Sequence, residues 1–227
     1  KSNAHALFCE WVYGMNLCQH GMADMMQIKR MLDALELKKG MSLLDFGCGD
    51  GRITEYIAGK TGTIVTGVDI AEGAIRLAQE RTTAKRDRMH FCYANIETGN
   101  GEFPAGVYDR ICAIDSIFFV HDLRLVVKTL LDHLVPGGKM AIFFICPPEI
   151  TERETKLAGV LGNMNLGYSV IDFSVENTRH WILKKQTLTD LQPLFFSEGS
   201  TFLFKNRMAE CNGLEQFHRY LYVISLS

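Results

Sequence analysis

The chain has 227 residues, of which 47% are hydrophobic and 10% aromatic, enough for one globular domain with a modest appendage. Its formal net charge is -2 and its basic residues are dispersed, which argues against a nucleic-acid substrate. The seven cysteines are odd in number and scattered, so we expect reduced thiols and no metal site. We find neither a signal peptide nor an apolar stretch that could span a bilayer, and therefore expect a cytoplasmic protein without a membrane partner.

Residues 5–38 are predicted to be helical, and we assign residues 5–40 to an N-terminal helical lid and residues 41–227 to the main domain. A methionine-rich stripe should face the sheet; it consists of Met22, Met25, Met26, Ile28, Met31, Leu32 and Leu35. The helical pattern breaks at residues 13–21, a polar and aromatic stretch between Gly14 and Gly21. Tyr13 and His20 are candidate ligand contacts there, although His20 and Gly21 could equally form a simple helix-ending turn.

Residues 41–46 form an apolar run that is typical of a strand buried on both faces of a parallel sheet. Three glycines then allow a sharp turn, and a helix opens near Gly51 with its free amides directed at the same space. Asp45 ends the strand beside that space. Ligands of open α/β sheets bind beyond the carboxyl ends of the strands, so the candidate contacts are Asp45, Gly47, Cys48, Gly49 and Gly51.

The glycine spacing separates this turn from two related ones. A dinucleotide fingerprint requires a third glycine at position 52, which is Arg52 here. A phosphate-binding P-loop requires Gly-Lys-Ser/Thr at the start of the helix, and that run is missing from the sequence. The spacing therefore argues against an NAD(P)-dependent oxidoreductase, which we retain as a minor alternative.

The following β–α units continue the pattern. Residues 63–69 are predicted to form the second strand, and Asp69 ends it about 20 residues after the glycine turn, where Rossmann folds place the carboxylate that binds ribose hydroxyls. A helix is expected over residues 71–84. Further strands are expected at residues 89–94, 108–115, 140–145, 168–175 and 217–226. Helices are expected at residues 123–134 and 150–165, and mixed helix and loop at residues 187–210.

The phrase D-x-G-C-G-x-G at residues 45–51 resembles the first motif of class I S-adenosylmethionine-dependent methyltransferases, and residues 134–138 resemble the L-x-P-G-G turn of that family. The resemblance implies an α/β, Rossmann-like doubly wound sheet of seven strands, mostly parallel with an antiparallel last strand. It implies S-adenosylmethionine as cofactor and S-adenosylhomocysteine as product. Besides the glycine turn and Asp69, the cofactor contacts that it implies are Ile70, Asn95, Ile96, Asp115 and Tyr13.

Residues 13–17 and Gly21 are similar to the lid of phosphoethanolamine methyltransferases, and Asp115 matches the acid that these enzymes carry after the fourth strand. They also have a tyrosine–histidine pair at the acceptor. The matching positions here are Leu17 and Phe119, neither of which can transfer a proton. The resemblance therefore implies a shared lid but does not extend to the substrate.

We expect methyl transfer by in-line displacement to a small-molecule acceptor at nitrogen, oxygen or carbon, in a monomer or homodimer. The residues expected near the acceptor are Asp115, Phe118, Phe119 and His121, with Tyr13 and His20 from the lid. Of these, His121, Asp115, His20 and Tyr13 are the candidates for proton transfer. His121 could instead be a surface or capping histidine. The phenylalanines at positions 195, 196, 202 and 204 are expected in the core, or alternatively in an aromatic wall of the acceptor pocket. A cofactor-binding regulator or partner subunit without catalytic activity is the alternative function.

Overall fold

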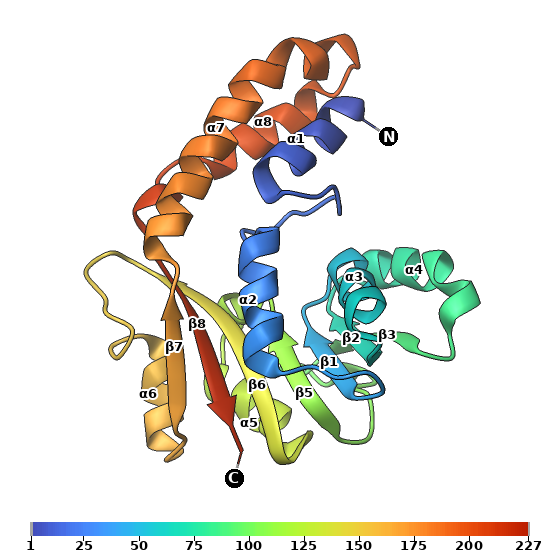
Figure 1. Cartoon of the computed structure of the whole chain (residues 1–227), viewed down its shortest axis with the longest axis vertical. Coiled ribbons are helices and arrows are strands. Elements are labelled where there is room, and N and C mark those ends of the chain that lie inside the picture. The colour runs from blue at the N-terminus through green and yellow to red at the C-terminus, as the bar shows by residue number, and fades with distance from the viewer. Residues whose placement is uncertain (1, 227) are drawn as a thin grey trace.

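Strand β1 (Ser42–Phe46) lies inside the central sheet of the computed structural model, which describes residues 2–226 (Figure 1). The strands stand in the order β4-β3-β2-β1-β5-β6-β8-β7. Their bounds are β2 Ile64–Asp69, β3 Met89–Asn95, β4 Asn100–Gly101, β5 Tyr108–Ala113, β6 Leu134–Cys146, β7 Tyr168–Asp172 and β8 His218–Ser225. The pairs formed by β1 with β2 and β5, β2 with β3, and β5 with β6 are parallel. Strand β8 runs antiparallel between β6 and β7.

This topology confirms the predicted mixed Rossmann-like sheet with an antiparallel last strand. The sheet has eight strands rather than seven, because the two-residue β4 pairs with the end of β3 at one edge. Strand β6 also begins earlier than expected. Residues 136–138, predicted as a turn, lie within it, and Gly137 donates its amide hydrogen bond to the carbonyl of Leu226.

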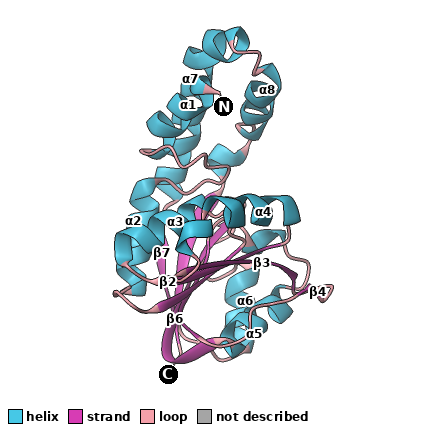
Figure 2. Ribbon diagram, turned by 90° about the vertical axis from the view of Figure 1, so that its right-hand side faces the viewer, coloured by secondary structure: helices cyan, strands magenta, loops and turns pink. Residues whose placement is uncertain are grey.

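Helices cover both faces of the sheet (Figure 2). Adjacent residues of a strand point to opposite faces, so Leu43 and Leu44 enter different cores. Leu43 packs with α2 (Met25–Leu35), α3 (Arg52–Thr61) and α4 (Glu72–Arg81), and Leu44 with α5 (Leu123–Asp132) and α6 (Lys156–Asn163). Short 3-10 turns lie at Thr83–Lys85, Ile117–Phe119 and Leu214–Gln216. Of the predicted methionine stripe, Met31 is fully buried whereas Met26 is 43% exposed, because it lies on the outer face of α2.

A helical cap lies beyond the carboxyl ends of the parallel strands (Figure 1). It consists of α1 (Asn3–Tyr13), α7 (Ser174–Ser197) and α8 (Thr201–Glu210), which share one apolar cluster. The cap thus combines helices from both ends of the chain, and α1 packs directly on α7. The predicted division of the chain at residue 41 stays a prediction.

The prediction for the segment that forms α7 was wrong. Strand structure was expected to residue 175 and mixed structure only from residue 187, whereas one helix covers Ser174–Ser197. Its buried face carries polar side chains, including Asn177, His180 and Lys184, so the usual apolar periodicity of a helix is masked. Among the four phenylalanines, Phe195 and Phe204 are buried in the cap, as expected for core residues, while Phe196 and Phe202 are exposed.

Among the helices of residues 2–226, none is sufficiently long and apolar to cross a membrane.

Candidate cofactor and substrate site

The glycine turn after β1 requires its three glycines for different reasons. All three have left-handed backbones, with φ of 77° at Gly47, 56° at Gly49 and 73° at Gly51. A Cβ at Gly47 would lie 2.1 Å from Ser116 Cβ, and one at Gly51 would lie 2.4 Å from the Phe91 ring. A Cβ at Gly49 would meet nothing within 4 Å. Gly47 and Gly51 therefore permit close packing, while Gly49 borders open space that a ligand can approach.

Hydrogen bonds join this turn to the end of β2. The amides of Gly47 and Cys48 donate to the carbonyl of Val68 at 2.7 and 3.1 Å. The carboxylate of Asp69 accepts from the Gly49 amide at 2.7 Å and from the Ala71 amide at 2.8 Å. The carboxylate predicted from the twenty-residue spacing therefore lies directly against the glycine turn.

A cavity of about 270 Å³ opens at this edge of the sheet. Six predicted contacts line it, namely Gly47, Asp69, Ile70, Asn95, Ile96 and Asp115, together with the predicted acceptor residue Phe119. Ile70 and Phe119 are 64% and 75% exposed, so both offer apolar surface to a ligand in the cavity. The sequence analysis did not identify the remaining lining residues, which are Phe46, Val68, Ala94, Glu97, Ser116, Val120 and Val126.

Asp45 and Cys48 lie behind the pocket wall. Asp45 is 2% exposed and its carboxylate accepts from Thr54 Oγ1 at 2.5 Å and from Cys112 Sγ at 3.5 Å. Burial raises the pKa of this carboxyl to about 6. Burial likewise raises the pKa of the Cys48 thiol well above its usual value, so the thiol stays protonated at neutral pH. In this structure Asp45 joins β1 to α3 and β5.

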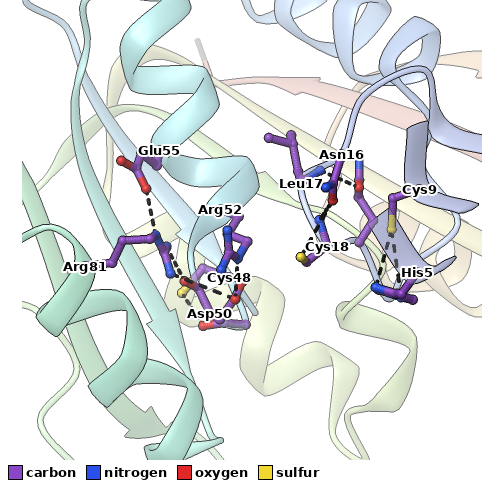
Figure 3. A network of polar contacts seen from close by, with 12 residues as sticks. His5, Cys9, Asn16, Leu17, Cys18, Cys48, Asp50, Arg52, Glu55 and Arg81 are labelled. Atoms are coloured by element: carbon purple, nitrogen blue, oxygen red, sulfur yellow. Dashed lines mark hydrogen bonds and ion pairs between the residues drawn. The ribbon is translucent and has the colours of Figure 1, made fainter. Parts of the chain in front are cut away.

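Ion pairs hold the glycine turn from its outer side (Figure 3). Arg81 of α4 donates to Glu55 at 2.8 Å and to the carbonyl of Asp50 at 2.5 Å, while Arg52 pairs with the Asp50 carboxylate at 2.9 Å. The turn is therefore fixed to both α3 and α4. Such preorganisation suits a turn that must present its backbone to a ligand.

The part of the predicted lid that resembles the lid of phosphoethanolamine methyltransferases, residues 13–21, lies in the connection between α1 and α2, and it is called the lid below. Its loop is closed by Gln19, which accepts from the Leu17 amide at 2.9 Å and donates to the carbonyl of Met15 at 3.0 Å. Asn16 accepts from the Cys18 amide at 3.2 Å (Figure 3). These bonds give residues 14–20 a defined conformation.

Asp115 connects the lid to the pocket. One carboxylate oxygen accepts from the amides of Met22 and Ala23 at 2.6 and 2.9 Å, and the other lies 2.6 Å from the guanidinium of Arg219. Burial opposes the charge on Asp115, but Arg219 and the two amides hold the pKa of the carboxyl below its usual value. Asp115 is therefore ionised at neutral pH.

The other candidates for proton transfer lie apart from the cavity lining. Tyr13 is 1% exposed and donates its hydroxyl hydrogen bond to the carbonyl of Gly21 at 2.8 Å. His20 is exposed, with its ring centroid 5.8 Å from that of His5. His121 is also exposed, and its backbone amide donates to Glu97 at 2.8 Å. The structure thus brings only Asp115 of these four to the cavity.

The strand order, the glycine turn and the carboxylate at the end of β2 define a Rossmann-like α/β protein with a ligand-sized cavity at the carboxyl ends of its strands. Comparisons with known proteins narrow this class. Residues 43–138 match the family model of a methyltransferase domain. This segment is a methyltransferase domain, and the proteins similar to the chain include phosphoethanolamine N-methyltransferases.

Two curated relatives illustrate the similarity. Phosphoethanolamine N-methyltransferase 1 of Zea mays is 32% identical over 137 residues, which are 60% of this chain and 26% of the relative. Ubiquinone biosynthesis O-methyltransferase of Idiomarina loihiensis is 34% identical over 105 residues, 46% of this chain and 42% of the relative. The chain thus matches about a quarter of the plant enzyme and less than half of the bacterial one.

A solved structure extends the similarity of fold to nearly the whole chain. Phosphoethanolamine N-methyltransferase 2 of Haemonchus contortus, in complex with phosphomonomethylethanolamine and S-adenosylhomocysteine, superposes with a TM-score of 0.80 at 17% identity. The match covers 98% of this chain and 56% of that protein. The predicted resemblance to S-adenosylmethionine-dependent methyltransferases is confirmed by these comparisons, which include structures holding the predicted cofactor or its product.

Proposed function

We propose that this chain binds S-adenosylmethionine in the cavity beyond β1, β2, β3 and β5 and transfers its methyl group to a small-molecule acceptor. The observation that carries the proposal is the unit formed by Gly49 and Asp69 beside that cavity. It offers a close backbone approach and a carboxylate at the place where the ribose of a nucleoside would lie. The family match at residues 43–138 supports the same function.

The described residues fit the cofactor. Asp69 keeps lone pairs for ribose hydroxyls beyond those that its two amide donors use. Ile70 and Ile96 supply apolar contacts for an adenine ring, and the backbone at Gly47 and Gly49 approaches the amino-acid end. Asp45, Cys48 and Gly51 would lie behind the residues that contact the cofactor and would stabilise the conformation of the glycine turn. A direct cofactor contact by Tyr13 or Asn95 stays a prediction.

When bound, the cofactor supplies a methyl group on a positively charged sulfur. The task of the chain is then to hold the acceptor in line with that methyl group and to exclude water. Phe119 and Asp115 border the space where the acceptor would lie, and the lid adjoins it through Asp115. The nucleophile would be nitrogen, oxygen or carbon, and an acceptor already deprotonated at neutral pH needs no base.

The alternative proposal is a cofactor-binding regulator or partner subunit without turnover. It is favoured because the titratable side chains on the described cavity lining are all carboxylates, those of Asp69, Glu97 and Asp115. The other candidates for proton transfer, His121, His20 and Tyr13, lie outside that lining. Neither proposal depends on whether the chain is a monomer or a homodimer.

Turnover separates the two proposals. The purified chain would be incubated with methyl-labelled S-adenosylmethionine and a panel of small amines, phenols, carboxylates and phosphobases. Label transfer to a panel member supports the enzyme, and binding of the cofactor without transfer to any class supports the regulator. Absence of cofactor binding would overturn both.

A further inference from the structure

The residues at the exit of β5 contact two functional segments at once. Ser116 Oγ donates to the carbonyl of Phe46 at 2.6 Å, and its Cβ occupies the space that a side chain at Gly47 would need. The neighbouring Asp115 accepts the amides of Met22 and Ala23 at the end of the lid. One dipeptide therefore joins the glycine turn to the lid.

The Asp115 carboxylate is fixed by a buried cation. Its side chain is 7% exposed and pairs with Arg219, which is 0% exposed. Arg219 also donates to Gln27 Oε1 at 2.8 Å and lies 4.6 Å from the centroid of the Phe143 ring. A buried ion pair with these additional contacts has a defined geometry. The carboxylate is thus held where the lid amides reach it.

The backbone at Asp115 is left-handed. Its φ is +55°, a conformation that residues other than glycine, asparagine and aspartate rarely adopt. A left-handed residue other than glycine persists where surrounding contacts determine the conformation, and such residues are concentrated at functional sites. Here the contacts come from Arg219 on one side and the lid on the other.

The lid fits this carboxylate closely at Gly21. A Cβ at Gly21 would lie 2.5 Å from the Asp115 carboxylate oxygen that accepts the lid amides. The carbonyl of Gly21 accepts from the Tyr13 hydroxyl at 2.8 Å. Three hydrogen bonds therefore hold residues 21–23, one accepted by a carbonyl and two donated by amides. The space at position 21 admits a hydrogen atom but no side chain.

We infer that Asp115 is a positioning residue, which together with Arg219 clamps residues 21–23 and thereby holds the lid closed beside the ligand pocket. Because Asp115 also lines that pocket, closure of the lid and occupation of the pocket are coupled. In this clamp the backbone amides of the lid bind Asp115, which Arg219 holds in place. The side chains of Leu17 and Phe119 take no part in it. Only the identity of the pocket's ligand rests on the proposed function.

Hydrogen exchange of individual amides tests the clamp in the protein without ligand. Asp115→Ala should accelerate exchange of the Met22 and Ala23 amides at least about tenfold, because these amides lose their acceptor. Amides within β1 and β6 should keep their wild-type rates. Glu154→Ala is the matched control, since this exposed carboxylate accepts the Thr151 amide at 3.1 Å in the connection between β6 and α6. Unchanged exchange at Met22 and Ala23 in Asp115→Ala would overturn the inference.

Gly21→Ala tests the same contact without removing a charge. Its added methyl group must displace the carboxylate, so we expect faster exchange at Met22 and Ala23 and about tenfold faster dissociation of S-adenosylhomocysteine. In the Asp115→Ala background the same substitution should add little, because both changes open one contact. Additive effects of the two substitutions on the dissociation rate would contradict a shared clamp.

The two arms distinguish failure of the clamp from failure of the proposed function. If S-adenosylhomocysteine does not bind the wild-type chain, the exchange experiment still decides the clamp, and the proposed function fails alone. If the ligand binds but its dissociation rate is equal in the wild type, Asp115→Ala and Gly21→Ala, the coupling fails and the proposed function stands.

Discussion

The carboxylate of Asp69 and the amide of Gly49 lie 2.7 Å apart, so the end of β2 and the turn after β1 form one hydrogen-bonded unit. The same carboxylate also accepts the Ala71 amide at the start of the connection to α4. A ligand that contacts Asp69 therefore meets a side chain whose orientation is already fixed. Preorganisation of this kind lowers the entropy lost on binding.

Removing the charge of Asp69 should weaken cofactor binding. Asp69→Asn keeps an oxygen for the Gly49 amide but loses the charged acceptor for ribose hydroxyls, so we expect a loss of about 1–3 kcal/mol in S-adenosylmethionine affinity. Calorimetric titration measures it. Asp132→Asn, an exposed residue at the end of α5 that pairs with Lys128, serves as the control. Equal affinities of Asp69→Asn and the wild type would show that the ribose lies elsewhere.

Two glycines with similar backbones should respond differently to substitution. Gly49 and Gly40 both have positive φ, 56° and 85°, and a Cβ at either would meet nothing within 4 Å. Alanine at each position should therefore cost a similar stability, roughly 1–2 kcal/mol, which urea denaturation measures. Only Gly49→Ala should weaken cofactor binding, by at least about tenfold, because its methyl group enters the ligand's space. Equal binding by the two variants would remove Gly49 from the site.

Exposed aromatic residues provide a second matched pair. Phe119 is 75% exposed at the pocket and Phe202 is 78% exposed on the cap. Neither alanine substitution should change the free energy of unfolding by more than about 0.5 kcal/mol, since little contact area is lost. Phe119→Ala should weaken ligand binding by about 1 kcal/mol, through the apolar area that a ligand covers, and Phe202→Ala should not. A change in both or in neither would argue that Phe119 does not contact the ligand.

The buried Asp45 predicts a specific dependence of stability on pH. Burial raises the pKa of its carboxyl to about 6 in the folded chain, above the usual 3.8. The folded state therefore binds the proton more tightly, and the stabilisation that this gives below pH 4 is lost as the pH rises to about 6. Asp45→Asn stays neutral throughout.

Relative to the wild type, Asp45→Asn should therefore gain on the order of 2–3 kcal/mol in the free energy of unfolding between pH 4 and pH 7. Urea denaturation at the two pH values measures this difference. A difference that is independent of pH would mean that the Asp45 carboxyl titrates normally in the folded chain.

Much of the sheet could be predicted from the sequence because local signals determined it. The parallel strands are rich in apolar residues, and polar or glycine residues stand at their carboxyl ends, as at Gly47 after β1 and Asp69 at the end of β2. Since the carboxyl ends of parallel strands share one edge, residues at the ends of several strands line the same cavity.

The connection between the lid and β8 could not be predicted in this way. Arg219 lies in a strand whose other buried residues are apolar or aromatic, and its partner Asp115 is distant in the sequence. No local pattern marks such a pair, which depends on β8 inserting beside β6. The predicted role of Asp115 at the acceptor likewise took no account of the two lid amides that occupy its carboxylate.

The central claim is that a sulfonium nucleoside binds against the glycine turn and Asp69. Calorimetric titration of the wild-type chain and of Gly49→Ala with S-adenosylhomocysteine, with NAD as a parallel ligand, tests it most directly. We predict one site per chain for S-adenosylhomocysteine, at least about tenfold weaker binding to Gly49→Ala, and no heat with NAD. The absence of heat with S-adenosylhomocysteine, or saturable binding of NAD in its place, would contradict the account.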